Sequence, residues 1–173
     1  YFLYTGNIEP KKNIGGLVRV FEKFCQQNKT HKLLMAGGRT WRCRDLWPKL
    51  ISNDRIRLID YVDADDLAHV YKLADAVVCT SHAEGFGFPV LEAFRSGVPV
   101  VSSNVGFLRQ LTDPPCPVAD PDDPAGFSEA IEKTISNKQL RKTLIKKGLK
   151  TAALFTSKRQ ATAMLEIYRQ LLK

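Results

Sequence analysis

Short apolar segments alternate with longer amphipathic segments over almost the whole chain, and this alternation narrows the possible folds more than any other feature. Apolar runs predict six strands, at Phe2–Thr5, Lys32–Ala36, Ile56–Ile59, Ala76–Thr80, Val98–Ser102 and Pro117–Ala119. Helical spacing of apolar residues predicts helices at Ile14–Gln26, Arg44–Ile51, Asp63–Leu73, Pro89–Arg95 and Gly106–Leu111. Three more helices are predicted to end the chain, at Pro124–Ser136, Lys138–Phe155 and Lys158–Leu172.

A helix follows each predicted strand, which is the connection that parallel strands need. The wholly apolar run Ala76–Thr80 is typical of a strand that is buried on both faces of a parallel sheet. The predicted class is therefore α/β, with a Rossmann-like, doubly wound parallel sheet of about six strands and helices at the C-terminus. Residues 1–173 read as one domain without an internal linker. Ligands of such sheets bind beyond the carboxyl ends of the strands, so the segments that follow the strands are the candidate site.

The composition is that of an ordinary globular protein, with 44% hydrophobic and 25% charged residues. No apolar run approaches the ~20 residues of a membrane helix, and the opening YFLYTG has neither the basic segment nor the cleavage site of a signal peptide. Because the chain opens directly on a strand, we expect a fragment of a longer protein. The four cysteines form no C-x-x-C pair, which predicts reduced thiols in a cytosolic protein.

The net charge of +8 is concentrated at one end of the chain. Residues 137–173 hold ten Lys or Arg and a single acid, Glu166. Such a basic helical surface can meet nucleic acid, an anionic membrane or an acidic partner, or it can simply be solvated. No nucleic-acid motif appears and aromatic residues do not interleave with the basic ones, so we do not expect nucleic acid as a partner.

The turn after the first predicted strand places Lys11 and Lys12 directly before a helix. Cations are unfavourable at a helix N-terminus, because the helix dipole is already positive there. A phosphate held by these lysines and by backbone N–H groups would compensate. Two solvated lysines on a loop are the alternative that this stretch leaves open.

A glycine-rich segment, SHAEGFGFPVLEAF at residues 81–94, follows the buried strand Ala76–Thr80. Gly85 and Gly87 allow a sharp turn and a close approach of the backbone to a ligand. Pro89 suits the first position of a helix, where its missing N–H is no loss. The segment therefore predicts a turn that leads into a helix at the ligand edge of the sheet.

Glu84 and Glu92 lie on either side of this turn, eight residues apart. Leu91 and Phe94 are predicted to face the sheet, which turns Glu92 toward the crevice. The dipole of the helix would also stabilise Glu92, but it does not explain Glu84 or the glycines. The two carboxylates are thus candidates to flank one bound molecule.

A pair of carboxylates is also the catalytic device of glycosidases, but a hydrolase has no use for the dilysine turn. A ligand that carries phosphate explains both features. Carboxylates suit its sugar hydroxyls, because each ionised oxygen accepts a strong hydrogen bond.

The run EGFGFPVLEA, Glu84–Ala93, resembles the E-x7-E motif of retaining GT-B glycosyltransferases, which move a sugar from a nucleotide diphosphate to an acceptor. The resemblance continues in YTGNIEPKKNI at residues 4–14, LLMAGG at 33–38, DLAHVYKLADA at 66–76 and SGVPVV at 96–101. It covers essentially the whole chain.

The resemblance implies that residues 1–173 are one half of a GT-B fold, namely the nucleotide-sugar (donor) binding domain, and that the N-terminal acceptor domain is absent from this chain. It implies transferase activity for the full-length parent, with retention of anomeric configuration. The nucleotide diphosphate sugar is then a co-substrate, and neither a cofactor nor a metal is needed.

By the same resemblance, Glu84 is the catalytic residue, near the donor sugar, and Glu92 holds the ribose hydroxyls. The other donor-binding residues that the resemblance implies are Gly6, Asn7, Lys11, Lys12, Tyr61, Val62, Gly85, Phe86, Gly87 and Phe88. The N–H groups of Gly85–Phe88 would face the sugar and the diphosphate.

The chain departs from the family pattern at three positions. Asn7 stands where many members have arginine, Asp60 where glycine is usual, and Gln110 where glutamate is frequent. Two of these departures, Asn7 and Gln110, keep open a non-catalytic nucleotide-sugar-binding or scaffold domain. A phosphorylase-like enzyme would need a lysine motif for pyridoxal phosphate, and none is evident.

The run EPKKN resembles a subgroup with EPRKN that contains mannosyltransferases of bacterial surface polysaccharides. GDP-mannose is therefore the favoured donor, with UDP-sugars as the alternative. The acceptor would be a glycan or a lipid-linked glycan, reached through the missing domain. The basic C-terminal helices would suit an anionic membrane surface, so we expect a cytoplasmic protein, peripheral at the inner face of the membrane.

Overall fold

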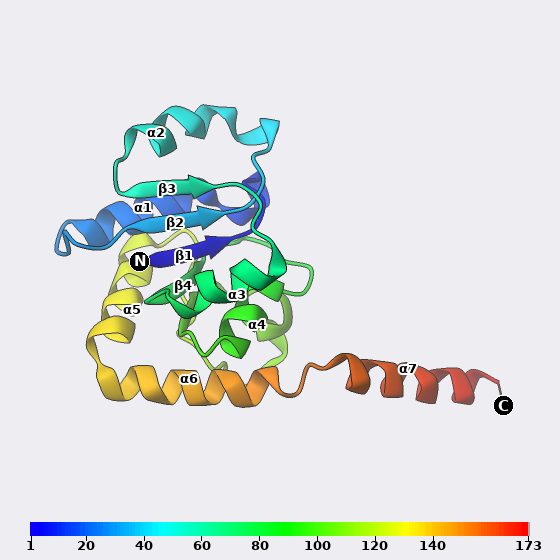
Figure 1. The fold of residues 1–173 in the computed structure, drawn as a ribbon. Coiled ribbons are helices and arrows are strands. Elements are labelled where there is room, and N and C mark those ends of the chain that lie inside the picture. Colours follow the sequence, from blue (N-terminus) through cyan, green and yellow to red (C-terminus); the bar gives the residue numbers. More distant parts are fainter. Residues whose placement is uncertain (173) are drawn as a thin grey trace.

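A parallel sheet of five strands forms the centre of the molecule (Figure 1). The computed structural model describes residues 1–172, and the side chains of all of these except Trp41 and Arg42. The strands are β1 (Phe2–Thr5), β2 (Leu33–Ala36), β3 (Ile56–Ile59), β4 (Ala76–Cys79) and β5 (Val100–Ser102). Their order is β3-β2-β1-β4-β5, so the direction of winding reverses between β1 and β4. That reversal point is where ligands of doubly wound sheets bind.

Seven α-helices connect and follow the strands within the described residues. They are α1 (Ile14–Cys25), α2 (Trp47–Ser52), α3 (Ala64–Lys72), α4 (Phe88–Arg95), α5 (Pro124–Ser136), α6 (Lys138–Ala152) and α7 (Ser157–Leu171). Short 3-10 helices occupy Pro10–Lys12, Trp41–Leu46 and Gly106–Gln110. None of the described helices combines the length and apolar character that crossing a membrane requires.

The sheet separates two hydrophobic cores because neighbouring strand residues point to opposite faces. Phe2 and Tyr4 of β1 enter the core shared with α1 and α5. Leu3 enters the other core, where Tyr71 of α3 and Phe94 of α4 pack. The four residues of β1 are all buried, as are those of β4. This burial on both faces explains why the central strands are uninterrupted apolar runs.

The predicted fold class is confirmed, but the predicted number of strands is wrong by one. The sixth segment, Pro117–Ala119, forms a single bridge between Val118 and Ser102 instead of a strand. The N–H of Ser102 donates to the carbonyl of Pro117, and the N–H of Ala119 donates to the carbonyl of Ser102. Pro117 has no N–H of its own, so the ladder cannot extend past it in that direction.

The helix predicted at Arg44–Ile51 is divided, because a 3-10 helix runs to Leu46 and α2 begins at Trp47. Pro48 lies in the first turn of α2, where proline is tolerated, whereas it would break a continuous helix. At the other end of the chain, α7 has no buried residue and extends away from the body in line with α6 (Figure 1).

Candidate functional site

A cleft of about 250 Å³ opens at the carboxyl edge of the sheet, close to the point where the winding reverses. Its walls come from the turns after β1, β2 and β3, from Leu67 of α3 and from the first two turns of α4. Six of the residues that the sequence assigns to donor binding line it: Gly6, Asn7, Tyr61, Val62, Phe88 and Glu92. Residues from five separate segments therefore meet at one place, as expected for strand ends in a parallel sheet.

One wall of the cleft depends on a very close approach between the turns after β1 and β2. A Cβ atom on Gly37 would lie 2.2 Å from the carbonyl oxygen of Gly6, so no other residue fits without a shift. Gly37 also has φ +147°, which side-chain-bearing residues rarely adopt. The N–H of Ile8 donates to the carbonyl of Gly38 at 2.9 Å and fixes the two turns together. Gly37 follows the second predicted strand and so falls within the predicted site, but no role of its own was predicted for it.

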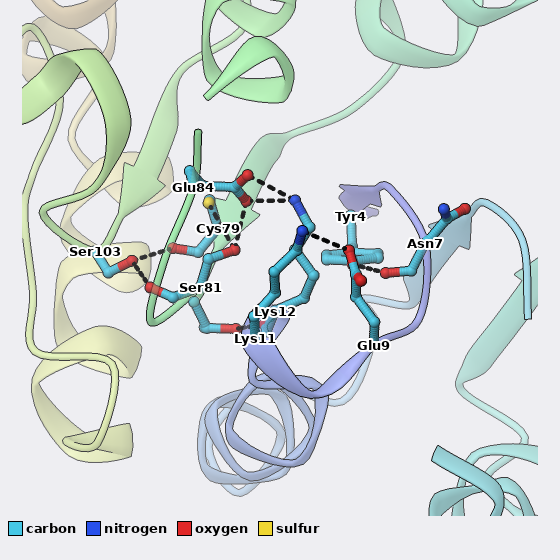
Figure 2. A network of polar contacts seen from close by, with 10 residues as sticks. Tyr4, Asn7, Glu9, Lys11, Lys12, Cys79, Ser81, Glu84 and Ser103 are labelled. Carbon is cyan, nitrogen blue, oxygen red and sulfur yellow. Dashed lines mark hydrogen bonds and ion pairs between the residues drawn. The ribbon is translucent and has the colours of Figure 1, made fainter. Parts of the chain in front are cut away.

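A buried ion pair lies beside this cleft (Figure 2). Lys12 Nζ is 2.7 Å from Oε1 and 2.6 Å from Oε2 of Glu84. Only 11% of the Lys12 side chain and 8% of the Glu84 side chain are exposed. The pair is next to the cleft, since a Cβ on Gly6 would lie 3.9 Å from Lys12 Cε. The structure thus joins two predicted site residues that are 72 positions apart in the chain.

Local backbone geometry holds Lys12 in this position. The next residue, Asn13, is left-handed with φ +50° and ends the short helix that carries Lys12. Its side chain caps α1 by accepting a hydrogen bond from the N–H of Gly16 at 3.1 Å. Asparagine is well suited to both tasks, because it tolerates this conformation and is a strong N-cap. The turn from the short helix into α1 therefore directs Lys12 inward.

The two lysines of the turn have different environments. Lys11 has 58% of its side chain exposed and lies 3.4 Å from Glu9, so it belongs to the surface. Figure 2 shows Lys12 reaching the carboxylate of Glu84, whereas Lys11 is drawn to Glu9. Of the two predicted lysines, Lys12 is the one that the fold brings into the site.

Two serines behind Glu84 fix its carboxylate (Figure 2). Ser81 donates its hydroxyl to Glu84 Oε1 at 2.7 Å. Ser103, after β5, donates to the carbonyl of Ser81 at 2.5 Å. Both serines are buried, so the Glu84 oxygen that faces Ser81 is satisfied within the protein. Both serines follow predicted strands, but neither was predicted to have a role, because single serines after strands form no specific pattern.

Tyr4 lies close to the same group and is almost entirely buried. Burial is the main reason that its pKa is raised far above the usual value for tyrosine, and the nearby Cys79 and Glu84 raise it further. The neutral hydroxyl donates to the carbonyl of Asn7 at 2.8 Å and so supports the turn after β1.

At the other end of the cleft, a buried tyrosine holds Glu92. Tyr71 is only 2% exposed, and its hydroxyl lies 2.7 Å from Glu92 Oε2 and 2.7 Å from Thr5 Oγ1. Burial raises the pKa of Tyr71 well above its ordinary value, with the charge of Glu92 as the next cause. The hydroxyl thus stays protonated and donates to the carboxylate, while Thr5 donates to it. In the sequence, Tyr71 looked like one residue of an apolar helical stripe.

The glycine-rich turn before α4 differs in one respect from the prediction. Only Gly87 is left-handed, with φ +95°, whereas Gly85 needs no special conformation. A Cβ on Gly85 would meet nothing within 4 Å, so this part of the turn faces open space. Within the described chain, no acceptor bonds the N–H groups of Gly85, Phe86, Gly87 or Phe88. The helix itself begins at Phe88 with Pro89 in its first turn, as predicted.

The ring of Phe86 belongs to an aromatic cluster. It stacks on Phe107 at 5.3 Å between centroids and meets Phe155 edge-on at 5.5 Å. The carbonyl of Phe86 accepts a hydrogen bond from the N–H of Phe107 at 2.8 Å. Gly106 makes this possible, because a Cβ there would lie 2.1 Å from that same carbonyl oxygen. Phe86 therefore anchors the turn through its side chain, and its N–H group is left for a ligand.

The arrangement offers complementary contacts to a phosphorylated sugar ligand. Lys12 and the unbonded N–H groups of residues 85–88 lie beside the cleft, and both suit phosphate oxygens. The cleft itself is lined by the fixed carboxylate of Glu92, which suits hydroxyl donors. Among residues 1–172, no group of three or more His, Cys, Asp or Glu side chains is placed to hold a metal ion.

Comparison with known proteins gives one family match and several close relatives. The family model described as Glycosyl transferases group 1 matches residues 1–151. The chain is 34% identical over 175 residues to O-antigen chain mannosyltransferase B of Escherichia coli, a match that covers 99% of this chain and 46% of that protein. The chain therefore spans less than half of the length of this relative.

Two solved structures have closely similar folds. Sucrose-phosphate synthase from Thermosynechococcus elongatus superposes with a TM-score of 0.85 and 28% identity, over 99% of this chain and 45% of that one. HepE from Anabaena, solved in complex with UDP and glucose, superposes with a TM-score of 0.85 and 18% identity, over 98% of this chain and 48% of that one.

Proposed function

The chain belongs to the Glycosyl transferases group 1 family, and from this we propose that it is the donor-binding domain of a retaining glycosyltransferase. The whole protein would transfer a hexose from a nucleotide diphosphate to a glycan or lipid-linked acceptor without a metal. The acceptor site would lie in a second domain outside these 173 residues. The 46% coverage of the mannosyltransferase relative supports this division.

The observation that carries the proposal is the meeting of Lys12, Glu84 and Glu92 around the cleft at the reversal point of the sheet. We assign the ribose hydroxyls to Glu92, whose carboxylate Tyr71 holds in place. The nucleobase would lie against Tyr61 and Val62, which line the same cleft. The diphosphate would then extend toward Lys12.

In this proposal, the chain stabilises charge on the leaving group. As the bond between the anomeric carbon and the diphosphate oxygen breaks, negative charge grows on the diphosphate. Lys12 and the N–H groups of residues 85–88 would neutralise that charge, as fixed donors do in other transfer reactions. The leaving phosphate oxygen would take the proton of the acceptor hydroxyl, which attacks from the same face, so that configuration is retained. Glu84 would contact the donor sugar.

We propose GDP-mannose as the donor, supported by the relative that is named a mannosyltransferase. UDP-sugars are the alternative, supported by the similar fold solved with UDP and glucose. Asp60, which precedes the turn at Tyr61 where the base would lie, is exposed and pairs with Arg39 at 3.4 Å.

A second candidate is a nucleotide-sugar-binding domain without catalysis. Asn7 lines the cleft and has no cationic group, so the diphosphate would lose one of two expected positive charges. The two candidates differ in whether the whole protein releases nucleoside diphosphate from the donor in the presence of acceptor.

Thermal unfolding of the chain with a panel of GDP, UDP, ADP and their sugars, in the presence of EDTA, tests the proposal. A ligand that binds only the folded state raises the unfolding temperature by mass action. We expect at least one nucleotide series to raise it, with GDP and GDP-mannose as the strongest. No shift with any nucleotide would refute the donor-binding role, and a shift that requires Mg²⁺ would refute the metal-independent site.

A further inference from the structure

The helix α6 carries six basic residues and no acid. Two of the six have partners in the fold. Lys147 pairs with Asp113 at 2.8 Å, and Arg141 donates to the backbone carbonyl of Asp75. The other four, Lys138, Lys142, Lys146 and Lys150, are exposed, and among the described residues none of them has an ion-pair partner. We call these four residues the lysine row.

The members of the row are four positions apart, so successive lysines are neighbours on the helix surface, and the row winds slowly around the helix by about 40° per step. Twelve residues separate its ends, which corresponds to about 18 Å along the axis. Like charges at this spacing destabilise a helix, and Lys138 in the first turn also opposes the helix dipole. The fold thus maintains a charge arrangement that is unfavourable to its own helix.

Packing on α4 fixes the direction of the row. The buried residues of α6 are Leu144, Gly148 and Ala152, which are also four positions apart and lie on the opposite side of the helix. A Cβ on Gly148 would lie 2.7 Å from Cδ1 of Phe94, so glycine lets α6 approach α4 closely. The helix cannot rotate without losing this contact, and the lysine row therefore points away from the body.

We propose that the lysine row docks the protein on an anionic lipid bilayer. Lysines on the outward side of a helix at the edge of the molecule can meet a flat charged surface, and each lysine near such a surface adds favourable energy. Leu149, which is 45% exposed, follows Lys142 by seven residues and Lys146 by three, so an apolar side chain shares this face. Apolar groups among lysines suit the interface between headgroups and acyl chains.

The position of the row is compatible with access to the candidate site. In Figure 1, α6 runs along one edge of the molecule, and the strands run roughly parallel to α6. The carboxyl ends of the strands, where the cleft lies, would then face sideways along a bilayer against α6, and the bilayer would not cover the cleft. The inference rests on the surface of α6 and does not require the proposed nucleotide site.

Cosedimentation with vesicles tests the inference. We expect the chain to bind vesicles of phosphatidylcholine with phosphatidylglycerol, to ignore pure phosphatidylcholine, and to detach as salt is raised. Glutamine at all four positions of the row should weaken binding at least tenfold, since each lysine contributes about fivefold. Arginine at the same four positions should preserve binding.

A second quadruple variant controls for net charge. Lys23, Lys29, Lys32 and Lys72 are exposed lysines outside the C-terminal helices, and glutamine at these positions removes the same charge. We expect this variant to bind anionic vesicles nearly as well as the wild type. Equal losses in both quadruple variants would overturn the inference, as would absence of vesicle binding by the wild type.

Row-dependent binding to duplex DNA or polyglutamate without vesicle binding would also overturn the inference, and would assign the row to another partner. Thermal shifts with nucleotides, measured on the row variant, should equal those of the wild type. That readout separates failure of the membrane surface from failure of the donor site.

Discussion

The ammonium group of Lys12 lies 2.7 Å and 2.6 Å from the two carboxylate oxygens of Glu84, and both side chains are nearly buried. A buried pair of this kind is costly to split, because either partner left alone is an uncompensated charge. A diphosphate that enters the site must share Lys12 with Glu84. Changes to this pair should therefore alter both the stability of the fold and its affinity for diphosphate.

Replacement of Lys12 should weaken diphosphate binding while replacement of its neighbour should not. For Lys12→Ala we expect a loss of about 1.5–3 kcal/mol, the range for a hydrogen bond to a charged group, or roughly ten- to a hundredfold in affinity. Lys11→Ala should change affinity by less than twofold, since Lys11 is exposed and lies 3.4 Å from Glu9. Titration calorimetry with inorganic diphosphate measures both. Unchanged affinity in Lys12→Ala would remove Lys12 from the site.

Lys12→Ala should also lower the stability of the fold, because it leaves the buried carboxylate of Glu84 without its cation. Lys12→Ala leaves Glu84 with Ser81 as its remaining hydrogen-bond donor, so we expect a loss of at least about 3 kcal/mol in the free energy of unfolding. Adding Glu84→Gln should recover part of that stability without restoring diphosphate binding. Urea denaturation measures the cycle. A double variant no more stable than Lys12→Ala would show that the pair is not electrostatically coupled.

Glu92→Gln should weaken the binding of nucleoside diphosphates but not the binding of inorganic diphosphate. The amide keeps an oxygen for the Tyr71 hydroxyl but loses the charge that attracts ribose hydroxyls. We expect nucleoside diphosphates to bind at least tenfold more weakly, whereas inorganic diphosphate keeps its affinity. If both ligands lose affinity equally, Glu92 does not hold the ribose.

Tyr71→Phe should also weaken the binding of nucleoside diphosphates, because it removes the hydrogen bond that holds Glu92 in place. The ring stays buried, but Glu92 loses its 2.7 Å donor and becomes free to turn. We expect nucleoside diphosphates to weaken severalfold and inorganic diphosphate to remain unaffected, with a loss of about 1–3 kcal/mol in stability from the unsatisfied Thr5 hydroxyl. Calorimetry and urea denaturation give the two values. Tyr168→Phe, on exposed α7, is the matched control and should alter neither.

Two glycines of the site should respond oppositely to alanine. Gly37→Ala would bring a methyl group 2.2 Å from the Gly6 carbonyl oxygen at φ +147°, and we expect at least about 2 kcal/mol of destabilisation. Gly85→Ala places its methyl group in open space and should stay within about 0.5 kcal/mol of the wild type. Chemical denaturation of the two variants provides the comparison. A stable Gly37→Ala would mean that the turns after β1 and β2 do not need their close contact.

Strands and the segment 81–94 were predictable because their signals are local. An apolar run such as Ala76–Thr80 predicts a strand without further information. Pro89 predicts the start of a helix, and α4 has it in its first turn. The sixth strand was predicted wrongly, because the effect of Pro117 depends on the strand that it lies beside. The sequence pattern does not reveal that partner. Local pattern and local backbone chemistry thus account for most of the fold.

The parts of the site that were not predicted depend on pairs of residues far apart in the chain. Tyr71 reaches Glu92 across 21 positions, and Ser103 reaches Ser81 across 22. Gly37 is required only because the turn at Gly6 lies against it. Such contacts follow from the register of neighbouring strands, which no single stretch of sequence encodes.

The anchoring of Phe86 has a consequence for the thermodynamics of binding. Its ring is packed against Phe107 and Phe155, and its carbonyl is bonded to the N–H of Phe107, before any ligand arrives. A loop that must be ordered by its ligand subtracts that conformational entropy from the affinity, whereas this loop has already lost it during folding. The contacts that a phosphate makes with these N–H groups are therefore not reduced by the cost of ordering this loop.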